Sequence, residues 1–132
     1  MKTLLLIFSS ITMLSLSNPK ETVSSAEVSG PVVSLNSDTF DFGNIQKGDN
    51  GTCVFELKND GFEPLIISKC DKTCGCTIPK CNHDPILPGE TTEVEVTYDT
   101  NRIGPFQKSV KVHSNASNTP LLVLKIKGTV TE

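Results

Sequence analysis

The sequence predicts an all-β domain built as a sandwich of two antiparallel sheets with about seven strands. From residue 31 onward, short apolar runs recur every 8 to 15 residues and alternate with a period of two, which is typical of half-buried strands. No segment shows the spacing of an amphipathic helix. Without helices to cover them, the two sheets must bury their apolar faces against each other.

The alternation is clearest in residues 52–58 and 92–99. The expected inward side chains of these two strands are Cys53, Phe55, Leu57, Val94, Val96 and Tyr98. The other expected strands are 31–35 with a continuation at 40–42, 65–69, 76–79, 108–114 and 121–130. Apolar residues also fall at outward positions of this pattern: Val54, Leu121 and Val123.

Turn-forming residues separate these strands. Gly-Asp-Asn-Gly at 48–51, Asn-Asp-Gly at 59–61, Leu-Pro-Gly-Glu at 87–90 and Ile-Gly-Pro at 103–105 supply the positive or fixed φ angles that tight turns require. Seven short strands in about 100 residues favour an immunoglobulin-like sandwich. The chain contains no Trp, and no cysteine at 108–114 faces Cys53, so we expect no inter-sheet disulfide of the antibody type.

The amino-terminal residues predict export. Lys2 precedes an uncharged run at 4–16, and small residues follow, as in a secretory signal peptide. The run is shorter than the roughly 20 residues of a spanning helix, so we expect a signal peptide over 1–17 and no membrane span after cleavage. Cleavage as late as residue 26 and an uncleaved anchor are the alternatives. A flexible tether at 18–30, rich in Ser, Glu and Pro, precedes the domain at 31–132. The expected location is periplasmic or secreted.

The charge of the chain excludes some classes of partner. It has 12 basic and 15 acidic residues, a net charge of −3, and no basic run. Such a chain offers no electrostatic footprint for nucleic acid or for an anionic membrane surface. We therefore expect no nucleic-acid partner.

A series of short motifs resembles one known family. The motifs are Phe40-Asp41-Phe42-Gly43-Asn44-Ile45, Asn59-x-Gly61-x-x-Pro64-Leu65, Cys74-Gly75-Cys76-Thr77, Pro88-Gly89-Glu90, Tyr98-Asp99, Gly104-x-Phe106 and Ser114-Asn115. Their order over about residues 35–130 resembles the bacterial domain of unknown function 1573 family, which is similar to the immunoglobulin-like domains of the Hydin group and, more distantly, to major sperm protein modules. The resemblance implies an immunoglobulin-like fold and export, but no activity. This chain departs from the usual pattern in carrying Cys70 and Cys81.

Four of the five cysteines form one cluster within twelve residues. They are Cys70, Cys74, Cys76 and Cys81, and His83 follows closely. In an exported protein this density favours disulfides, and four cysteines allow three pairings. Two such bonds would rigidify the loop at 70–83, each contributing about 3 kcal/mol or less by the loop-length relation.

Two other interpretations of the cluster remain open. Thiolates bind Cu(I) and Zn(II), so the four cysteines and His83 are candidate ligands of a copper or zinc ion, although their spacing fits no zinc ribbon. Alternatively, one of Cys74 and Cys76 can attack a disulfide while the other resolves the intermediate, because nearby lysines favour thiolates.

The remaining polar residues predict no catalytic site. The aspartates at 38, 41, 60, 84 and 99 lie in or beside expected turns, and His113 is expected to point outward from its strand. Cys53 is expected to be a buried free thiol. We therefore predict an exported non-enzymatic module without a cofactor, with a protein-interaction or structural role and an unidentified protein partner. Strand addition at an open sheet edge is one route to such a partner.

Overall fold

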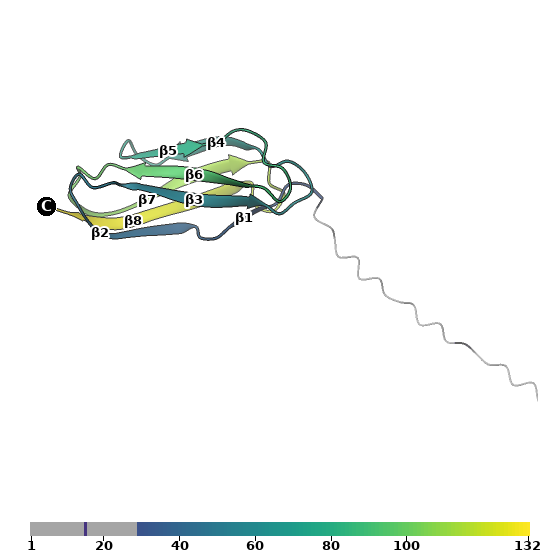
Figure 1. The fold of residues 1–132 in the computed structure, drawn as a ribbon, viewed down its shortest axis with the longest axis horizontal. Helices are drawn as coiled ribbons and strands as arrows, with labels where there is room; N and C mark the ends of the chain where they lie inside the picture. Colours follow the sequence, from purple (N-terminus) through teal and green to yellow (C-terminus); the bar gives the residue numbers. More distant parts are fainter. Residues whose placement is uncertain (1–14, 16–28) are drawn as a thin grey trace, which may run out of the picture.

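The computed structural model describes residue 15 and residues 29–132, and its strands form a sandwich of two four-stranded sheets (Figure 1). The first sheet has the order β1 (Val33–Leu35), β3 (Thr52–Asn59), β6 (Thr91–Tyr98) and β5 (Thr77–Cys81). The second has the order β2 (Thr39–Gln46), β8 (Leu121–Thr131), β7 (Gly104–Ser114) and β4 (Ile67–Lys72). The all-β immunoglobulin-like fold class is confirmed. Apart from residue 15, the expected signal peptide at 1–17 lies outside the described residues, as does the tether at 18–30 apart from residues 29 and 30.

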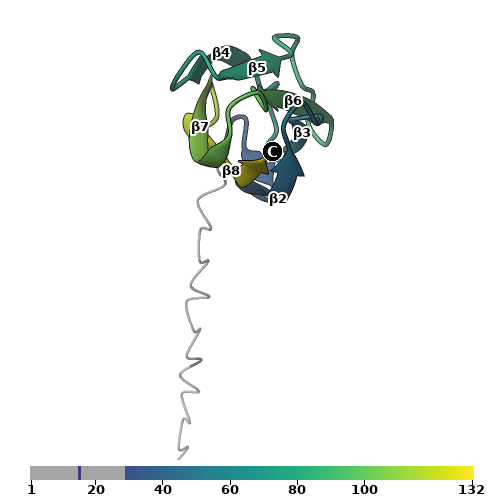
Figure 2. The same cartoon turned by 90° about the vertical axis from the view of Figure 1, so that its left-hand side faces the viewer.

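Alternating side chains build the core between the sheets. In β3, Cys53, Phe55 and Leu57 are buried, while Val54 and Glu56 between them are exposed, as their spacing predicts. The most deeply buried aliphatic residues are Leu57, Leu65, Ile67, Val94, Val96, Val110, Val112, Leu124, Ile126 and Val130, each at most 1% exposed. Burying one such side chain contributes about 1.5 to 3 kcal/mol. The view along the strands shows how they are arranged around the interior of the sandwich (Figure 2).

Residues 29–132 contain eight strands, where the sequence predicts about seven. The segments 31–35 and 40–42, expected to form one interrupted strand, belong to different sheets as β1 and β2. Asn36, Ser37 and Asp38 break the extended run, and the Ser37 hydroxyl accepts a hydrogen bond from the backbone N–H of Thr39 (3.3 Å). The chain therefore crosses from one sheet to the other at this point.

One strand pair also departs from the expected antiparallel arrangement. β2 runs parallel to β8, with a register shift between Asp41 and Asn44, whereas the other pairs of named strands are antiparallel. The crossover before β2 places it beside β8 in this direction. β7 also begins at Gly104, four residues earlier than the expected strand at 108–114.

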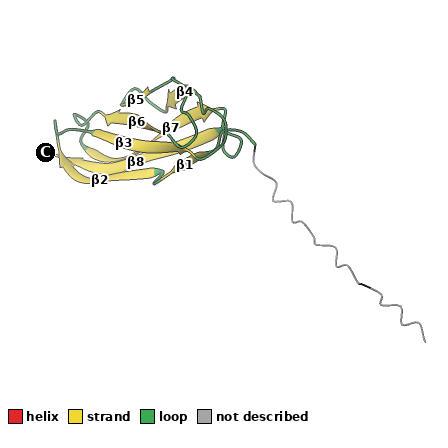
Figure 3. Ribbon diagram, turned by 45° about the vertical axis from the view of Figure 1, so that its right-hand side comes forward, coloured by secondary structure: helices red, strands yellow, loops and turns green. Residues whose placement is uncertain are grey.

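The two ends of the sandwich carry different loops. The chain enters from residue 29 at one end, and the C-terminus lies at the opposite end together with the turn between β4 and β5 (Figure 1). In residue 15 and residues 29–132 the drawing shows strands and loops (Figure 3), and no helix there is long and apolar enough to cross a membrane. Cys74 and Cys76, at this turn, therefore lie at the end distant from the entering chain.

Candidate functional site: the cysteine loop and the strand edges

Two nested disulfides join the four clustered cysteines. Cys70 of β4 is bonded to Cys81 of β5, with their Cα atoms 6.6 Å apart, and Cys74 is bonded to Cys76 within the connecting turn. β4 is the edge of one sheet and β5 is the edge of the other. The outer disulfide therefore fastens the two sheets together along one side of the sandwich.

The inner disulfide has one partly exposed and one buried member. Cys76 is only 2% exposed, and its carbonyl accepts a hydrogen bond from the backbone N–H of Asp99 (2.8 Å). Cys74 is half-buried and lies outside any strand. The hydroxyl of the fully buried Thr77 lies 3.8 Å from the Cys76 sulfur and 4.0 Å from the Cys74 sulfur. Since disulfide sulfurs only accept, Thr77 donates to this bond.

Hollows of opposite charge flank the inner disulfide. The hollow beside Cys74 is lined by Thr73, Gln107, Lys108, Ser109, Val123 and Lys125, so its charged groups are two lysines. The hollow beside Gly75 and Cys76 includes Asp49, Asp99 and Tyr98. An anionic group is therefore attracted from the Cys74 side and repelled from the Cys76 side.

The expected alternative of a copper or zinc site does not fit these residues. All four cysteines are consumed in disulfides, whereas a soft metal ion requires free thiolates. His83 donates from Nδ1 to the carbonyl of Ile67 (2.7 Å) and so fastens its loop to β4. Within residue 15 and residues 29–132, no three His, Cys, Asp or Glu side chains are grouped to hold a metal ion.

A histidine–aspartate pair lies on the outer surface of the second sheet. His113 Nε2 is 3.0 Å from Asp71, and the ammonium of Lys69 is 3.1 Å from the same carboxylate. The hydrogen bond from Lys69 and the further one from His113 lower the pKa of Asp71. Asp71 lies on β4 and His113 on the neighbouring β7, and the Asp71 carboxylate is already paired with both Lys69 and His113. We interpret it as a surface ion pair, in line with the outward orientation expected for His113.

The free cysteine, Cys53, is a buried part of the core. Its side chain is 4% exposed, and burial raises the pKa of its thiol to about 11. The thiol is therefore protonated at neutral pH, and a protonated buried thiol is unreactive.

We predict that Cys53 is protected from alkylation in the folded protein. Iodoacetamide at pH 8 should add no alkyl group to the native protein, whereas the same reagent in guanidinium chloride without reductant should add one. The added mass, measured on the intact protein, gives the count. Rapid labelling of Cys53 under native conditions would contradict its burial.

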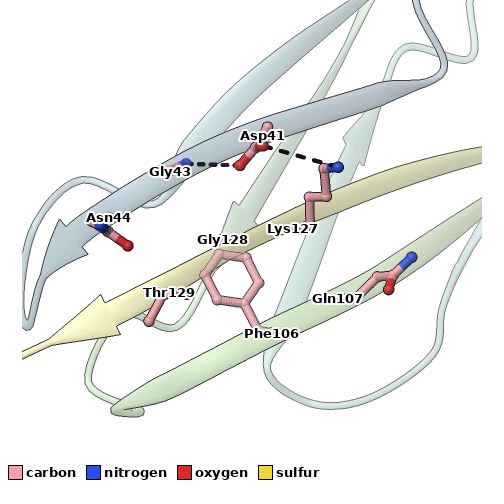
Figure 4. Close-up of a pocket in the computed structure, with 8 residues that line it drawn as sticks. All are labelled: Asp41, Gly43, Asn44, Phe106, Gln107, Lys127, Gly128 and Thr129. Carbon is pink, nitrogen blue, oxygen red and sulfur yellow. Dashed lines mark hydrogen bonds and ion pairs between the residues drawn. The ribbon is translucent and has the colours of Figure 1, made fainter.

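A polar hollow at the β2 bulge is structural in origin. Figure 4 shows Asp41 and Gly43 of β2, Lys127 and Gly128 of β8, and Phe106 of β7 around it. The Asp41 carboxylate accepts a hydrogen bond from the Gly43 N–H (2.8 Å) and lies 3.9 Å from the Lys127 ammonium. These contacts provide partners for the Gly43 N–H and the Asp41 carboxylate at the point where the register of β2 shifts. The hollow contains no nucleophile beside a base.

We predict that Gly43→Ala destabilises the protein although the site has room. A Cβ at residue 43 would meet no atom within 4 Å, but the φ angle of +64° is strained for alanine. The expected loss of unfolding free energy is about 1 kcal/mol. Gly75→Ala is the matched control, since a Cβ at residue 75 also meets nothing and its φ is not positive. Equal urea midpoints for the two variants would contradict the strain at residue 43.

Side chains form hydrogen bonds with backbone groups of the edge strands, where the sequence suggests strand addition. Asn118 pairs with Val33 of β1, accepting from its N–H (3.1 Å) and donating to its carbonyl (2.9 Å). On β2, the N–H groups of Gly43 and Gln46 donate to Asp41 and Asp49, both at 2.8 Å. β5 carries Pro79, which has no N–H. These features remove backbone donors that strand addition would use on β1, β2 and β5.

Asn59, which the sequence predicts to lie in a turn, is a buried polar residue that also bonds backbone groups of other segments. It is 0% exposed, and its amide donates to the carbonyls of Glu63 (2.7 Å) and Ile86 (2.8 Å). Its side-chain oxygen accepts from the N–H groups of Gly61 (2.9 Å) and Val32 (3.4 Å). One side chain therefore joins the start of the domain to two loops. The Asn-x-Gly spacing signalled the contact with Gly61 but none of the others.

Large apolar side chains are exposed on the loops at this same end. Phe62 is 78% exposed, Leu87 51% and Ile66 41%. Their two loops are held together by Leu65 and Ile86, whose backbone groups exchange hydrogen bonds of 2.9 and 2.8 Å. We call Phe62, Ile66 and Leu87 the loop patch.

Comparison with known proteins places the fold. The family described as "Protein of unknown function (DUF1573)" matches residues 33–130, and no curated protein sequence matches the chain. A protein of unknown function from Porphyromonas gingivalis W83 superimposes with a TM-score of 0.69 at 18% identity over 83% of this chain and 51% of that one. The chain thus spans about half the length of that protein.

Two further structures share the sandwich. PapD-like domain 7 of human CEP192 has a TM-score of 0.63 and 14% identity, covering 96% of this chain and 99% of that one. The periplasmic chaperone SfaE has a TM-score of 0.54 and 11% identity, covering 76% and 58%. At these identities the likeness shows the fold alone, an immunoglobulin-like sandwich.

Proposed function

Because the chain belongs to the DUF1573 family, whose function is unknown, we propose from its own residues that it is an exported, non-enzymatic immunoglobulin-like module with a protein-interaction or structural role. Its location would be the periplasm or the exterior of the cell. Its partner would be another protein, bound through the loop patch.

The disulfides support export. Two bonds among four clustered cysteines persist in an oxidising compartment, whereas cytosolic reductants would open them. Alkylation of the mature protein in denaturant without reductant should therefore add one group, at Cys53. The same intact mass locates the amino terminus left by signal cleavage. Four or five alkyl groups would contradict the proposal.

The loop patch is the observation that carries the interaction role. Scattered single apolar side chains are normal on a surface, but three large ones on two adjoining loops are unusual. Phe62 is the most exposed of the apolar side chains described, and the bridge between Leu65 and Ile86 holds its loop in place. A rigid apolar surface loses little conformational entropy on binding, which favours affinity.

A photo-crosslinking experiment tests this role. A photoreactive phenylalanine analogue replaces Phe62 in the full chain in its native host, and the same analogue replaces Lys111, an exposed residue on the outer face of β7, as the control. We expect a defined protein adduct from position 62 only, and its loss with Leu87→Ser. Folded protein that forms no adduct at position 62, or equal adducts at both positions, would contradict the loop patch as the binding surface.

A further inference from the structure

The two disulfides differ in how the fold holds their cysteines. Cys70 is paired in register with Val112 of β7, and Cys81 with Val94 of β6, so strand pairing positions both halves of the outer bond. Cys74 belongs to a turn outside the strands, and its carbonyl accepts only a long hydrogen bond, from the Thr77 N–H at 3.5 Å. If both bonds opened, the fold would keep Cys70 and Cys81 together and would release Cys74.

The inner bond is open to attack from one direction. Cys76 is 2% exposed, whereas Cys74 is partly exposed and lines a hollow, so an incoming nucleophile meets Cys74 first. Lys108 and Lys125 line the hollow in front of Cys74. These ammonium groups attract a thiolate, the nucleophile of disulfide exchange.

The buried side of the bond can receive the leaving group. When the bond between Cys74 and Cys76 breaks, the electron pair stays on the Cys76 sulfur, 3.8 Å from the Thr77 hydroxyl. Thr77 is fully buried, and its two hydrogen-bonding contacts through Oγ1 are with these two sulfurs. Its proton therefore stabilises the departing thiolate.

We propose that the Cys74–Cys76 disulfide is a thiol–disulfide exchange site that accepts two electrons from an exported dithiol protein, while Cys70–Cys81 stays closed. A thiolate of the partner attacks the Cys74 sulfur, a mixed disulfide forms, and Cys76 leaves as a thiolate that takes a proton from water. The partner's second thiol then loses its proton to water, and the resulting thiolate attacks the partner's first sulfur in the mixed disulfide. This step forms the partner's disulfide and releases Cys74 as a thiolate, which takes a proton from water. The partner is oxidised to its disulfide, and this chain is reduced to the Cys74, Cys76 dithiol.

The order of reduction follows from pre-organisation. A disulfide is more stable when the fold already holds its two thiols together, because the effective concentration of one thiol near the other is higher. The strands do this for Cys70 and Cys81 and not for Cys74. We therefore expect the inner bond to have the more oxidising potential.

Stepwise reduction of the native full-length protein tests the site. The folded protein is equilibrated with mixtures of reduced and oxidised dithiothreitol, quenched with acid, alkylated and digested, and each cysteine is quantified by mass spectrometry. The equilibrium constant for reduction should be at least tenfold larger for Cys74–Cys76 than for Cys70–Cys81, a difference of about 30 mV. Reduction of Cys70–Cys81 first, or of both bonds together, would overturn the proposal.

Thr77→Val tests the hydroxyl directly. Valine has nearly the same shape and replaces the hydroxyl with a methyl group. With reduced thioredoxin as the dithiol, this variant should be reduced about three- to tenfold more slowly at Cys74–Cys76, consistent with the loss of one hydrogen bond of ordinary net strength. Thr92→Val, the same change at a buried site on β6 at the opposite end of the sandwich, is the matched control and should react at the wild-type rate. Equal rates for the two variants would remove Thr77 from the mechanism.

The lysines give an independent test. Lys108→Gln combined with Lys125→Gln should slow attack by the dithiothreitol thiolate several-fold at low ionic strength, and salt should narrow the difference. Lys47→Gln combined with Lys58→Gln removes the same charge from residues that do not line the hollow beside Cys74 and should leave the rate unchanged. An equal effect of the two pairs would assign the attraction to net charge and overturn the role of this hollow.

Discussion

Replacing Asn59 with alanine is expected to lower the free energy of unfolding by about 3 to 5 kcal/mol, because several buried backbone groups lose their partner at once. The side chain bonds Glu63, Ile86 and Gly61 at 2.7 to 2.9 Å and Val32 at 3.4 Å, and the residue is 0% exposed. Asn59→Asp should be similarly harmful, since it exchanges two donated hydrogen bonds for a buried negative charge that faces carbonyl oxygens.

Urea unfolding followed by circular dichroism measures this loss. Asn50→Ala is the matched control, because Asn50 makes one side-chain hydrogen bond, to the Thr52 N–H (3.0 Å), in an exposed turn. That variant should lose about 1 kcal/mol or less. Midpoints shifted equally by the two alanine variants would show that Asn59 does not hold the loops together.

The parts of the fold that depend on local pattern follow from the sequence. Period-two alternation assigns Phe55 and Leu57 inward and Glu56 outward, since successive side chains of a strand face opposite sides. Gly89, in the predicted turn at 87–90, has the positive φ that such turns require. These features need information only from neighbouring residues.

Pairing between distant segments does not follow from the sequence. The parallel partner of β2 is β8, more than eighty residues away in the chain, and Thr39–Gln46 has no alternating burial pattern that would select one of the two sheets. The same limit applies to Asn59. Its contact with Gly61 is local and visible in the Asn-x-Gly motif, whereas its contact with Ile86 exists only after two loops meet.

In the candidate site, too, some features follow from the local sequence and others depend on how distant segments pair. The density of cysteines and the evidence for export favour disulfides, but three pairings are equally compatible with the spacing. The pairing of Cys70 with Cys81 follows only when β4 and β5 are placed on the edges of different sheets. Likewise, His83 looks like a possible metal ligand until its contact with Ile67 is known.

Removing the outer disulfide is expected to cost about 3 kcal/mol of unfolding free energy by the loop-length relation. The bond closes a sequence separation of 11 residues and joins the edges of the two sheets. The inner disulfide closes a separation of only 2 residues, so the unfolded chain gains little freedom when it is lost. Cys70→Ser combined with Cys81→Ser should therefore lower the urea midpoint more than Cys74→Ser combined with Cys76→Ser.

Comparing the two double variants distinguishes the structural role of Cys70–Cys81 from the exchange role proposed for Cys74–Cys76. Since β4 and β5 are each held on one side only, by β7 and β6, opening the outer bond should also increase amide hydrogen exchange along both strands. Opening the inner bond should increase exchange only in the turn between them. Equal losses of stability in the two double variants would mean that the sheets do not need the Cys70–Cys81 bond. Strand pairing and the hydrogen bond between Ile67 and His83 would then suffice to hold this side of the sandwich together.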